Sequence, residues 1–365
     1  SLADGRQPIF NEDRSVVVVF NGELFDYIEQ RAALESKGHR FSTHSDTEVL
    51  VHLWEEHGEG MLDHIDGQFA FALYDVSRRT LILARDRVGI APLHWARRGD
   101  TIYFGSEIKA IFASGEVVPE ADPKGIDHIF TFFAMGTRRT AFKGVEAVHP
   151  ASYLKIQFGA SGSVADVSER RYWDLEFPDQ GDERDPRDGR AIQEEFEETF
   201  RKAVEIRLRA DVPVVSYLSG GVDSTTVLHT ASQVKGEPIP SFTIQIPTEG
   251  LDETDRAIMA AETVGSRPTV AKCPGEVISA AFPQLIEAAE APVMDTSCSA
   301  LYCLAREVRD HGYKVALTGE GADDWLAGYP WFKSAKILGM FDRGGFRPGT
   351  WVRRWALKRN SPDVE

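Results

Sequence analysis

The stretch Val212-Pro213-Val214-Val215-Ser216-Tyr217-Leu218-Ser219-Gly220-Gly221-Val222-Asp223-Ser224 decides the fold of the second half of the chain. Its first part, up to Leu218, is apolar enough for a buried strand, and a helix is predicted from Ser224 to about Val234. Two glycines between a strand and a helix let the main chain approach a ligand closely. Because backbone N–H groups converge on an anion at this kind of turn, the loop is a candidate phosphate-binding site.

The same alternation of strand and helix continues on both sides of this loop. An amphipathic helix is predicted at 191–207, and the elements after the loop are a strand at 241–246, helices at 253–264 and 296–311, and a strand at 314–317. Alternation of this kind is typical of an α/β domain with a parallel sheet. The C-terminal domain is therefore predicted to cover 191–365.

The first 155 residues have a different pattern. Short apolar runs bounded by turn residues predict strands at 16–20, 67–74 and 81–84, and one helix is expected from Asp46 to Glu56, with Ser45 as its cap. This pattern predicts an α+β domain of layered antiparallel sheets with helices. Residues 156–190 are expected to be connecting strands and a linker, because 177–190 is rich in Pro, Gly, Asp and Arg.

Composition narrows the class of function. The chain has 365 residues, 42% hydrophobic and 27% charged, with a formal net charge of -16. This charge disfavours nucleic acid and anionic membranes as partners, and no apolar run is long enough to span a bilayer. The three cysteines lack metal-site spacing and the ten histidines are scattered, so we read the histidines as ordinary surface or core residues and expect a cytoplasmic protein.

Asp223 is the unusual member of the glycine loop. A carboxylate beside a phosphate is repulsive unless a divalent cation lies between them, so Asp223 is a candidate Mg²⁺ ligand. The loop lacks the lysine of a Walker motif, and no GxGxxG follows a strand. On its own, the loop could equally be a glycine-rich turn without a ligand.

Two sets of motifs resemble known families. Ser219–Ser224 resembles the pyrophosphatase loop of ATP-pyrophosphatases, and Val315-Ala316-Leu317-Thr318-Gly319-Glu320-Gly321-Ala322-Asp323-Asp324 resembles the second signature of asparagine synthetases. In the first half, five segments resemble class II glutamine amidotransferases, of the N-terminal-nucleophile fold, in family order: 21–23, 45–48, 67–72, 85–90 and 104–110. Together they resemble the glutamine-hydrolysing asparagine synthetase family.

The resemblance implies roles for individual residues. Asn21 and Gly22 would form an oxyanion hole, while Asn21, Glu23 and Asp46 would bind glutamine, the two carboxylates holding its amino group. Glu320 would accept a proton from ammonia, and Asp223 and Asp323 would hold Mg²⁺. The implied ATP-binding residues are Leu218, Ser219, Gly220, Gly221, Asp223, Ser224, Thr243, Thr318 and Gly319.

The implied reaction converts glutamine, aspartate and ATP to asparagine through β-aspartyl-AMP, and the resemblance also implies a homodimer. The family's N-terminal cysteine nucleophile and its downstream lysine have no match here, so we expect a fragment truncated at both ends and inactive by itself. Alternatives are an amidotransferase or β-lactam-synthetase-like enzyme that adenylates another carboxylate, and a non-catalytic nucleotide-binding regulator. Retention of Asn21, Gly22, Glu23 and Asp46 disfavours the β-lactam reading, and Asp223, Glu320 and Asp323 disfavour the regulator.

Overall fold

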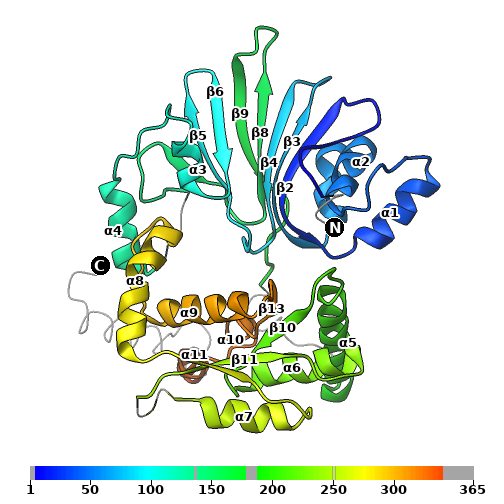
Figure 1. The fold of residues 1–365 in the computed structure, drawn as a ribbon. Coiled ribbons are helices and arrows are strands. Elements are labelled where there is room, and N and C mark those ends of the chain that lie inside the picture. The colour runs from blue at the N-terminus through cyan, green and yellow to red at the C-terminus, as the bar shows by residue number, and fades with distance from the viewer. Residues whose placement is uncertain (1–4, 135–137, 178–186, 249, 251, 340–365) are drawn as a thin grey trace. The chain divides into compact units, whose positions relative to one another are not determined.

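The computed structural model describes residues 5–134, 138–177, 187–248, 250 and 252–339 (Figure 1). The chain forms two compact units. The first comprises residues up to Pro213 together with Lys272–Gly312, and the second comprises Val214–Ala271 and the residues from Tyr313 onward. Each unit is described by itself below.

The first unit is built on a six-stranded sheet with the order β1-β2-β3-β4-β8-β9, in which every neighbouring pair is antiparallel. Its strands are β1 Ile9–Phe10, β2 Val16–Leu24, β3 Gly67–Asp75, β4 Thr80–Arg85, β8 Ser152–Phe158 and β9 Val164–Arg171. The central strand β3 is almost wholly buried, because both of its faces are covered. The sheet continues past residue 155, since β8 crosses that position and β9 pairs with it.

Helices and a smaller sheet complete this part of the unit. Helix α2 packs against β1 and β2, next to α1 (Figure 1), and Trp54 of α2 donates from Nε1 to Asp75 Oδ2 at 2.9 Å. The smaller antiparallel sheet has the order β6-β5-β7. The bounds are α1 Tyr27–Ser36, α2 Thr47–His57, the 3-10 helix η1 Gly58–His64, β5 His94–Arg98, β6 Thr101–Gly105, α3 Ile108–Phe112, α4 Pro123–Phe132 and β7 Val145–Ala147.

Three later helices also belong to the first unit: α5 Gly189–Arg207, α8 Gly275–Ala289 and α9 Ser297–Asp310. Charged contacts join two of these segments to the N-terminal part of the same unit. Just after α5, Arg209 donates to both carboxylate oxygens of Glu29, at 2.7 and 2.8 Å. Just after α8, Glu290 accepts from the backbone of Ile108 and Lys109, both at 2.6 Å. The expected domain limits at 155 and 190 stay a prediction, and residues 178–186 of the expected linker lie outside the described residues.

The second unit has a four-stranded sheet with the order β12-β11-β10-β13. Strand β10 pairs in parallel with β11 on one side and with β13 on the other. The elements are β10 Val214–Tyr217, α6 Val222–Lys235, β11 Ser241–Gln245, α7 Thr254–Glu262, β12 Thr269–Lys272, β13 Val315–Leu317, α10 Ala322–Trp325 and α11 Pro330–Gly339. From β10 the chain adds β11 and then β12 on one side of the sheet, and it later returns to add β13 on the other side of β10. The strand order therefore reverses between β10 and β13. In open α/β sheets this reversal is where ligands bind.

The predicted fold class is confirmed: antiparallel sheets form in the N-terminal part and a parallel sheet in the C-terminal part. The predicted cap of α2 was wrong by one residue. Asp46 is the N-cap and accepts from Thr47 N at 2.8 Å, whereas Ser45 Oγ makes a longer bond of 3.3 Å to the same N–H. A carboxylate at this position also suits the positive end of the helix dipole.

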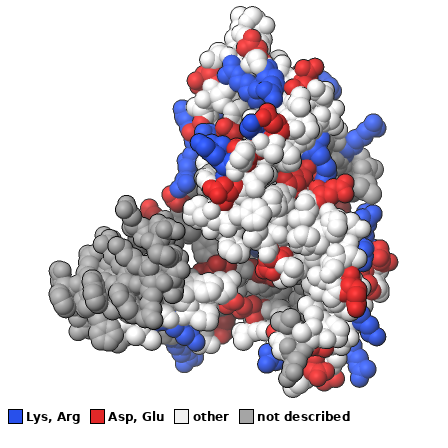
Figure 2. Space-filling model, turned by 90° about the vertical axis from the view of Figure 1, so that its left-hand side faces the viewer, with Lys and Arg blue, Asp and Glu red and all other residues white. Residues whose placement is uncertain are grey.

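No helix among the described residues is both long and apolar enough to cross a membrane. On the face drawn in Figure 2, Lys and Arg side chains lie among Asp and Glu side chains.

Candidate active site

The glycine loop of the second unit ends β10 and opens α6. Ser219 and Ser224 close it, because their hydroxyl oxygens lie 3.0 Å apart and Ser219 N donates to Ser224 Oγ at 3.2 Å. Gly221 N donates to Ser219 Oγ at 3.2 Å. Gly220 has φ +77, and a Cβ there would lie 2.6 Å from Arg256 Cβ and 2.7 Å from Ala257 N. Glycine is therefore required at this turn.

Helix α6 begins without a side-chain cap, and its N-cap residue is Gly221. The first N–H groups of a helix have no partner within the helix, and they carry the positive end of its dipole. An uncapped start of a 14-residue helix, directly after a glycine turn, is suited to bind phosphate oxygens.

The second motif meets this loop at Gly319. A Cβ on Gly319 would lie 2.8 Å from Ser224 N and 3.0 Å from both the carbonyl carbon and Cβ of Asp223. The loops after β10 and β13 are therefore in direct contact at the reversal of strand order. Leu218 N donates to Phe242 O at 2.8 Å, and Thr243 is buried in the same neighbouring strand, β11.

Carboxylates gather beside this contact. Glu320 and Asp323 are exposed, Asp223 is half-buried, and Thr318 is exposed at the end of β13. The pKa of Tyr329 is raised, most of all by the carboxylate of Asp324 and next by burial. The carboxylates of Asp323 and Glu320 add smaller contributions in the same direction. The three acidic groups thus share one neighbourhood, which favours cations. Carboxylate oxygens are the ligands that Mg²⁺ prefers, so Asp223 and Asp323 are chemically suited to that ion.

In the first unit, Asn21, Gly22 and Glu23 lie at the end of β2. Gly22 has φ +147, and a Cβ there would collide with Gln68 O and lie 2.8 Å from Phe69 Cα, so no other residue can occupy this position without moving β3. Asn21 is exposed, and its Nδ2 donates to Ser106 Oγ at 3.0 Å. The sequence analysis assigned no role to Ser106, although it quoted the segment 104–110 that contains it.

Asp46 links the end of β2 to the start of α2. Its Oδ2 accepts from Leu24 N at 3.0 Å, while Oδ1 caps the helix. Desolvation and the nearby carboxylate of Asp46, and then that of Asp211, raise the pKa of Glu23. The structure therefore brings Glu23 and Asp46 together, and two neighbouring carboxylates favour a cation such as an ammonium group between them.

Arg85 and Asp86 hold the next loop in shape. Arg85 donates to the carbonyls of Gly89, Ala91 and Val148 at 2.7, 2.7 and 2.9 Å. Asp86, 1% exposed, accepts four backbone N–H groups at 2.9–3.2 Å, including Phe69 N of β3. The segment 85–90, quoted above only for its resemblance, thus has a structural role that its Arg-Asp pair could have signalled.

Two family models match the chain in succession. Residues 1–173 match a glutamine amidotransferase domain, and residues 195–363 match asparagine synthase. The chain is 34% identical over 345 residues to the amidase chyE of Penicillium rubens, covering 90% of this chain and 50% of that protein. It is 30% identical over 342 residues to a glutamine-hydrolysing asparagine synthetase of Bacillus subtilis, covering 94% of this chain and 52% of that one. The chain thus spans about half the length of these relatives.

Proposed function

Because the chain belongs to the family of glutamine-hydrolysing asparagine synthetases, with a glutamine amidotransferase and an asparagine synthase domain, we propose that the whole protein is an ATP-dependent ligase that uses glutamine as amide donor. Its acceptor is the side-chain carboxylate of aspartate. A carboxylate oxygen attacks the α-phosphorus of ATP and pyrophosphate leaves. Ammonia then attacks the acyl carbon of β-aspartyl-AMP, and AMP leaves with the two electrons of the broken bond.

The observation that carries this proposal is the contact of Gly319 with Asp223 and Ser224. It brings the uncapped start of α6 and the acidic loop after β13 to one place, as phosphate binding and carboxylate activation in one pocket require. Mg²⁺ held by Asp223 and Asp323 would neutralise phosphate charge, and Glu320 would take the proton released as ammonia attacks.

In the first unit, the Asn21 side chain and the Gly22 N–H would stabilise the oxyanion formed when the amide of glutamine is attacked. Glu23 and Asp46 would hold the α-ammonium group of glutamine through charge-assisted hydrogen bonds. The raised pKa of Glu23 supports this role, because a cation between the two carboxylates would relieve their repulsion.

The test follows nitrogen and phosphate separately in the full-length protein. Incubation with ATP, Mg²⁺, aspartate and amide-¹⁵N glutamine should give ¹⁵N-asparagine, AMP and pyrophosphate. Asp223→Asn should lower aspartate-dependent ATP–pyrophosphate exchange by at least about 10²-fold, the upper end of the effect of losing an outer-shell metal contact, and leave glutamine hydrolysis intact. Glu23→Gln should lower glutamine hydrolysis and leave ATP–pyrophosphate exchange intact. Glu116 is exposed, and Glu116→Gln is the matched control. If the wild-type protein shows neither pyrophosphate exchange nor glutamine hydrolysis, the result would favour the non-catalytic regulator.

A second acceptor has specific support. The amidase of Penicillium rubens is 34% identical to this chain, against 30% for the Bacillus subtilis synthetase. Trp325 and Leu326, beside the acidic loop, are 58% and 59% exposed, and such apolar groups suit an acceptor larger than aspartate. Pyrophosphate exchange that depends on an aromatic or peptide carboxylate, but not on aspartate, would identify that acceptor class.

A further inference from the structure

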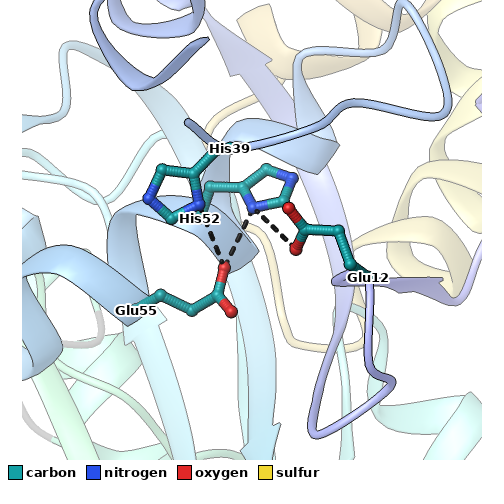
Figure 3. Close-up of side chains that lie close together, drawn as sticks. All are labelled: Glu12, His39, His52 and Glu55. Carbon is teal, nitrogen blue, oxygen red and sulfur yellow. Dashed lines mark hydrogen bonds and ion pairs between the residues drawn. The ribbon is translucent and has the colours of Figure 1, made fainter. Parts of the chain in front are cut away.

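Two histidines that are not among the candidate active-site residues meet two glutamates in the first unit (Figure 3). Glu12 comes from the turn between β1 and β2, His39 from the loop after α1, and His52 and Glu55 from one face of α2. One possible ligand atom from each residue lies within 4.8 Å of all the others. From this geometry we propose that Glu12, His39, His52 and Glu55 form a binding site for a divalent transition metal of the Zn²⁺ type.

The spacing of the four atoms is close to that of a tetrahedral site. His52 Nδ1 lies 2.9 Å from Glu55 Oε2 and 3.6 Å from Glu12 Oε2, and His39 Nδ1 lies 3.4 Å from Glu55 Oε2. Zinc bonds of about 2.0–2.2 Å put neighbouring tetrahedral ligand atoms roughly 3.3–3.6 Å apart. The widest pair, at no more than 4.8 Å, would have to close by at most roughly 1.5 Å. Imidazole and carboxylate ligands together favour Zn²⁺ over Mg²⁺ or Ca²⁺.

Hydrogen bonds outside the cluster orient three of its members. Asn11 Nδ2 donates to the other oxygen of Glu55 at 2.7 Å, and Arg40 N donates to the other oxygen of Glu12 at 2.9 Å. The second ring nitrogen of His39 lies 3.0 Å from Glu56 Oε1. A carboxylate on the remote nitrogen of a histidine is the usual support of a metal-binding imidazole.

The state of His52 gives an independent reason for a cation. Its side chain is fully buried, and its Nε2 has no hydrogen-bond partner among the described residues; the Glu48 carboxylate lies 3.9 Å away. If the ring hydrogen is on Nδ1, where it is donated to Glu55, the unprotonated Nε2 directs its lone pair toward the Glu48 carboxylate. A metal on Nδ1 moves the hydrogen to Nε2, where it faces Glu48 favourably. A doubly protonated ring would satisfy both nitrogens as well, and binding experiments separate these two explanations.

The test is calorimetric titration of the purified, metal-free full chain with Zn²⁺. The wild-type protein should bind one Zn²⁺ in a saturable step attributable to this cluster. Glu12→Gln and His39→Gln should each weaken that step by at least tenfold, and Glu56→Gln, an outer partner, by about 10–100-fold. His57→Gln is the matched control, because His57 is exposed on the same helix and outside the cluster.

Zn²⁺ should also raise the unfolding temperature of the wild-type and His57→Gln proteins but not of Glu12→Gln, because the ion joins three segments of the folded chain. This readout does not depend on ATP, glutamine or any activity. Absence of saturable Zn²⁺ binding in the wild-type protein, as a protonated His52 would give, overturns the proposal. Binding that is equally tight in Glu12→Gln and His39→Gln also overturns it, since the ion would then sit elsewhere, for example on cysteines.

Discussion

Replacing Gly319 by alanine should separate the two proposed half-reactions. The added methyl group would lie 2.8 Å from Ser224 N and 3.0 Å from the carbonyl carbon and Cβ of Asp223. None of these atoms belongs to the flexible end of a side chain, so the clash can be relieved only if one of the two loops moves. The phosphate loop and the acidic loop would therefore part at the point where they now touch.

The size of the effect follows from that displacement. Carbon atoms pack best at about 3.5–4.0 Å, so contacts of 3.0 Å require a shift of roughly 0.5–1 Å. A misplacement of about 1 Å in an active site can lower the rate about 10²-fold, or about 2.7 kcal/mol in transition-state free energy. Overpacking should also reduce the free energy of unfolding by about 1–3 kcal/mol.

The assay is aspartate-dependent ATP–pyrophosphate exchange in the full-length protein, with glutamine hydrolysis measured in parallel. Gly319→Ala should lower exchange about 10²-fold and leave hydrolysis unchanged. Gly275→Ala is the matched control, because nothing lies within 4 Å of a Cβ at that position. Exchange in Gly319→Ala within threefold of wild type would refute the claim that this contact sets the geometry of the nucleotide site.

Three further substitutions test other parts of the structure. Burial would raise the pKa of Glu48, but hydrogen bonds from the backbone and hydroxyls of Ser42 and Thr43 outweigh burial and lower that pKa. The ionised carboxylate should therefore stabilise the fold above pH 4.5, and this stabilisation should be lost as pH falls through the lowered pKa. In urea unfolding, the difference in unfolding free energy between the wild-type protein and Glu48→Gln should become smaller in acid. Asp86→Asn should cost about 3 kcal/mol of unfolding free energy in the same assay, because hydrogen bonds to a charged group contribute about 1.5–3 kcal/mol each. Under the proposed function, Asn21→Ala should slow glutamine hydrolysis about 10²–10³-fold and spare synthesis from added ammonia.

Local sequence predicted the elements around the phosphate loop well, because each of them carries its own signal. The strand before Ser219 is a run of apolar residues, and the glycines mark the turn, so β10 and α6 were predicted close to their observed bounds. Helix α8 was not predicted. Pro283 lies within it, and a proline in the interior usually ends or kinks a helix, so the sequence did not indicate one continuous helix here.

Contacts that depend on the sheet order could not be read from sequence. The meeting of Gly319 with Asp223 requires β10 and β13 to be neighbours, although about a hundred residues separate them. The same limit applies to the histidines. They have no metal-site spacing, and His39 and His52 come together only because α2 packs beside the β1–β2 turn and the loop after α1.

The charge around the second site also constrains how a nucleotide would bind under the proposed function. Asp324, Asp323 and Glu320 together raise the pKa of Tyr329, and Asp223 lies in the first turn of α6, so the site is acidic although its proposed ligand is an anion. Free ATP would be repelled, whereas ATP bound to Mg²⁺ would bring the compensating charge. We therefore expect ATP binding to be at least tenfold weaker in EDTA than in Mg²⁺, and Asp223→Asn to reduce that difference. Tight binding of metal-free ATP would contradict this reasoning, because the helix N-terminus would then outweigh the carboxylates without help from a cation.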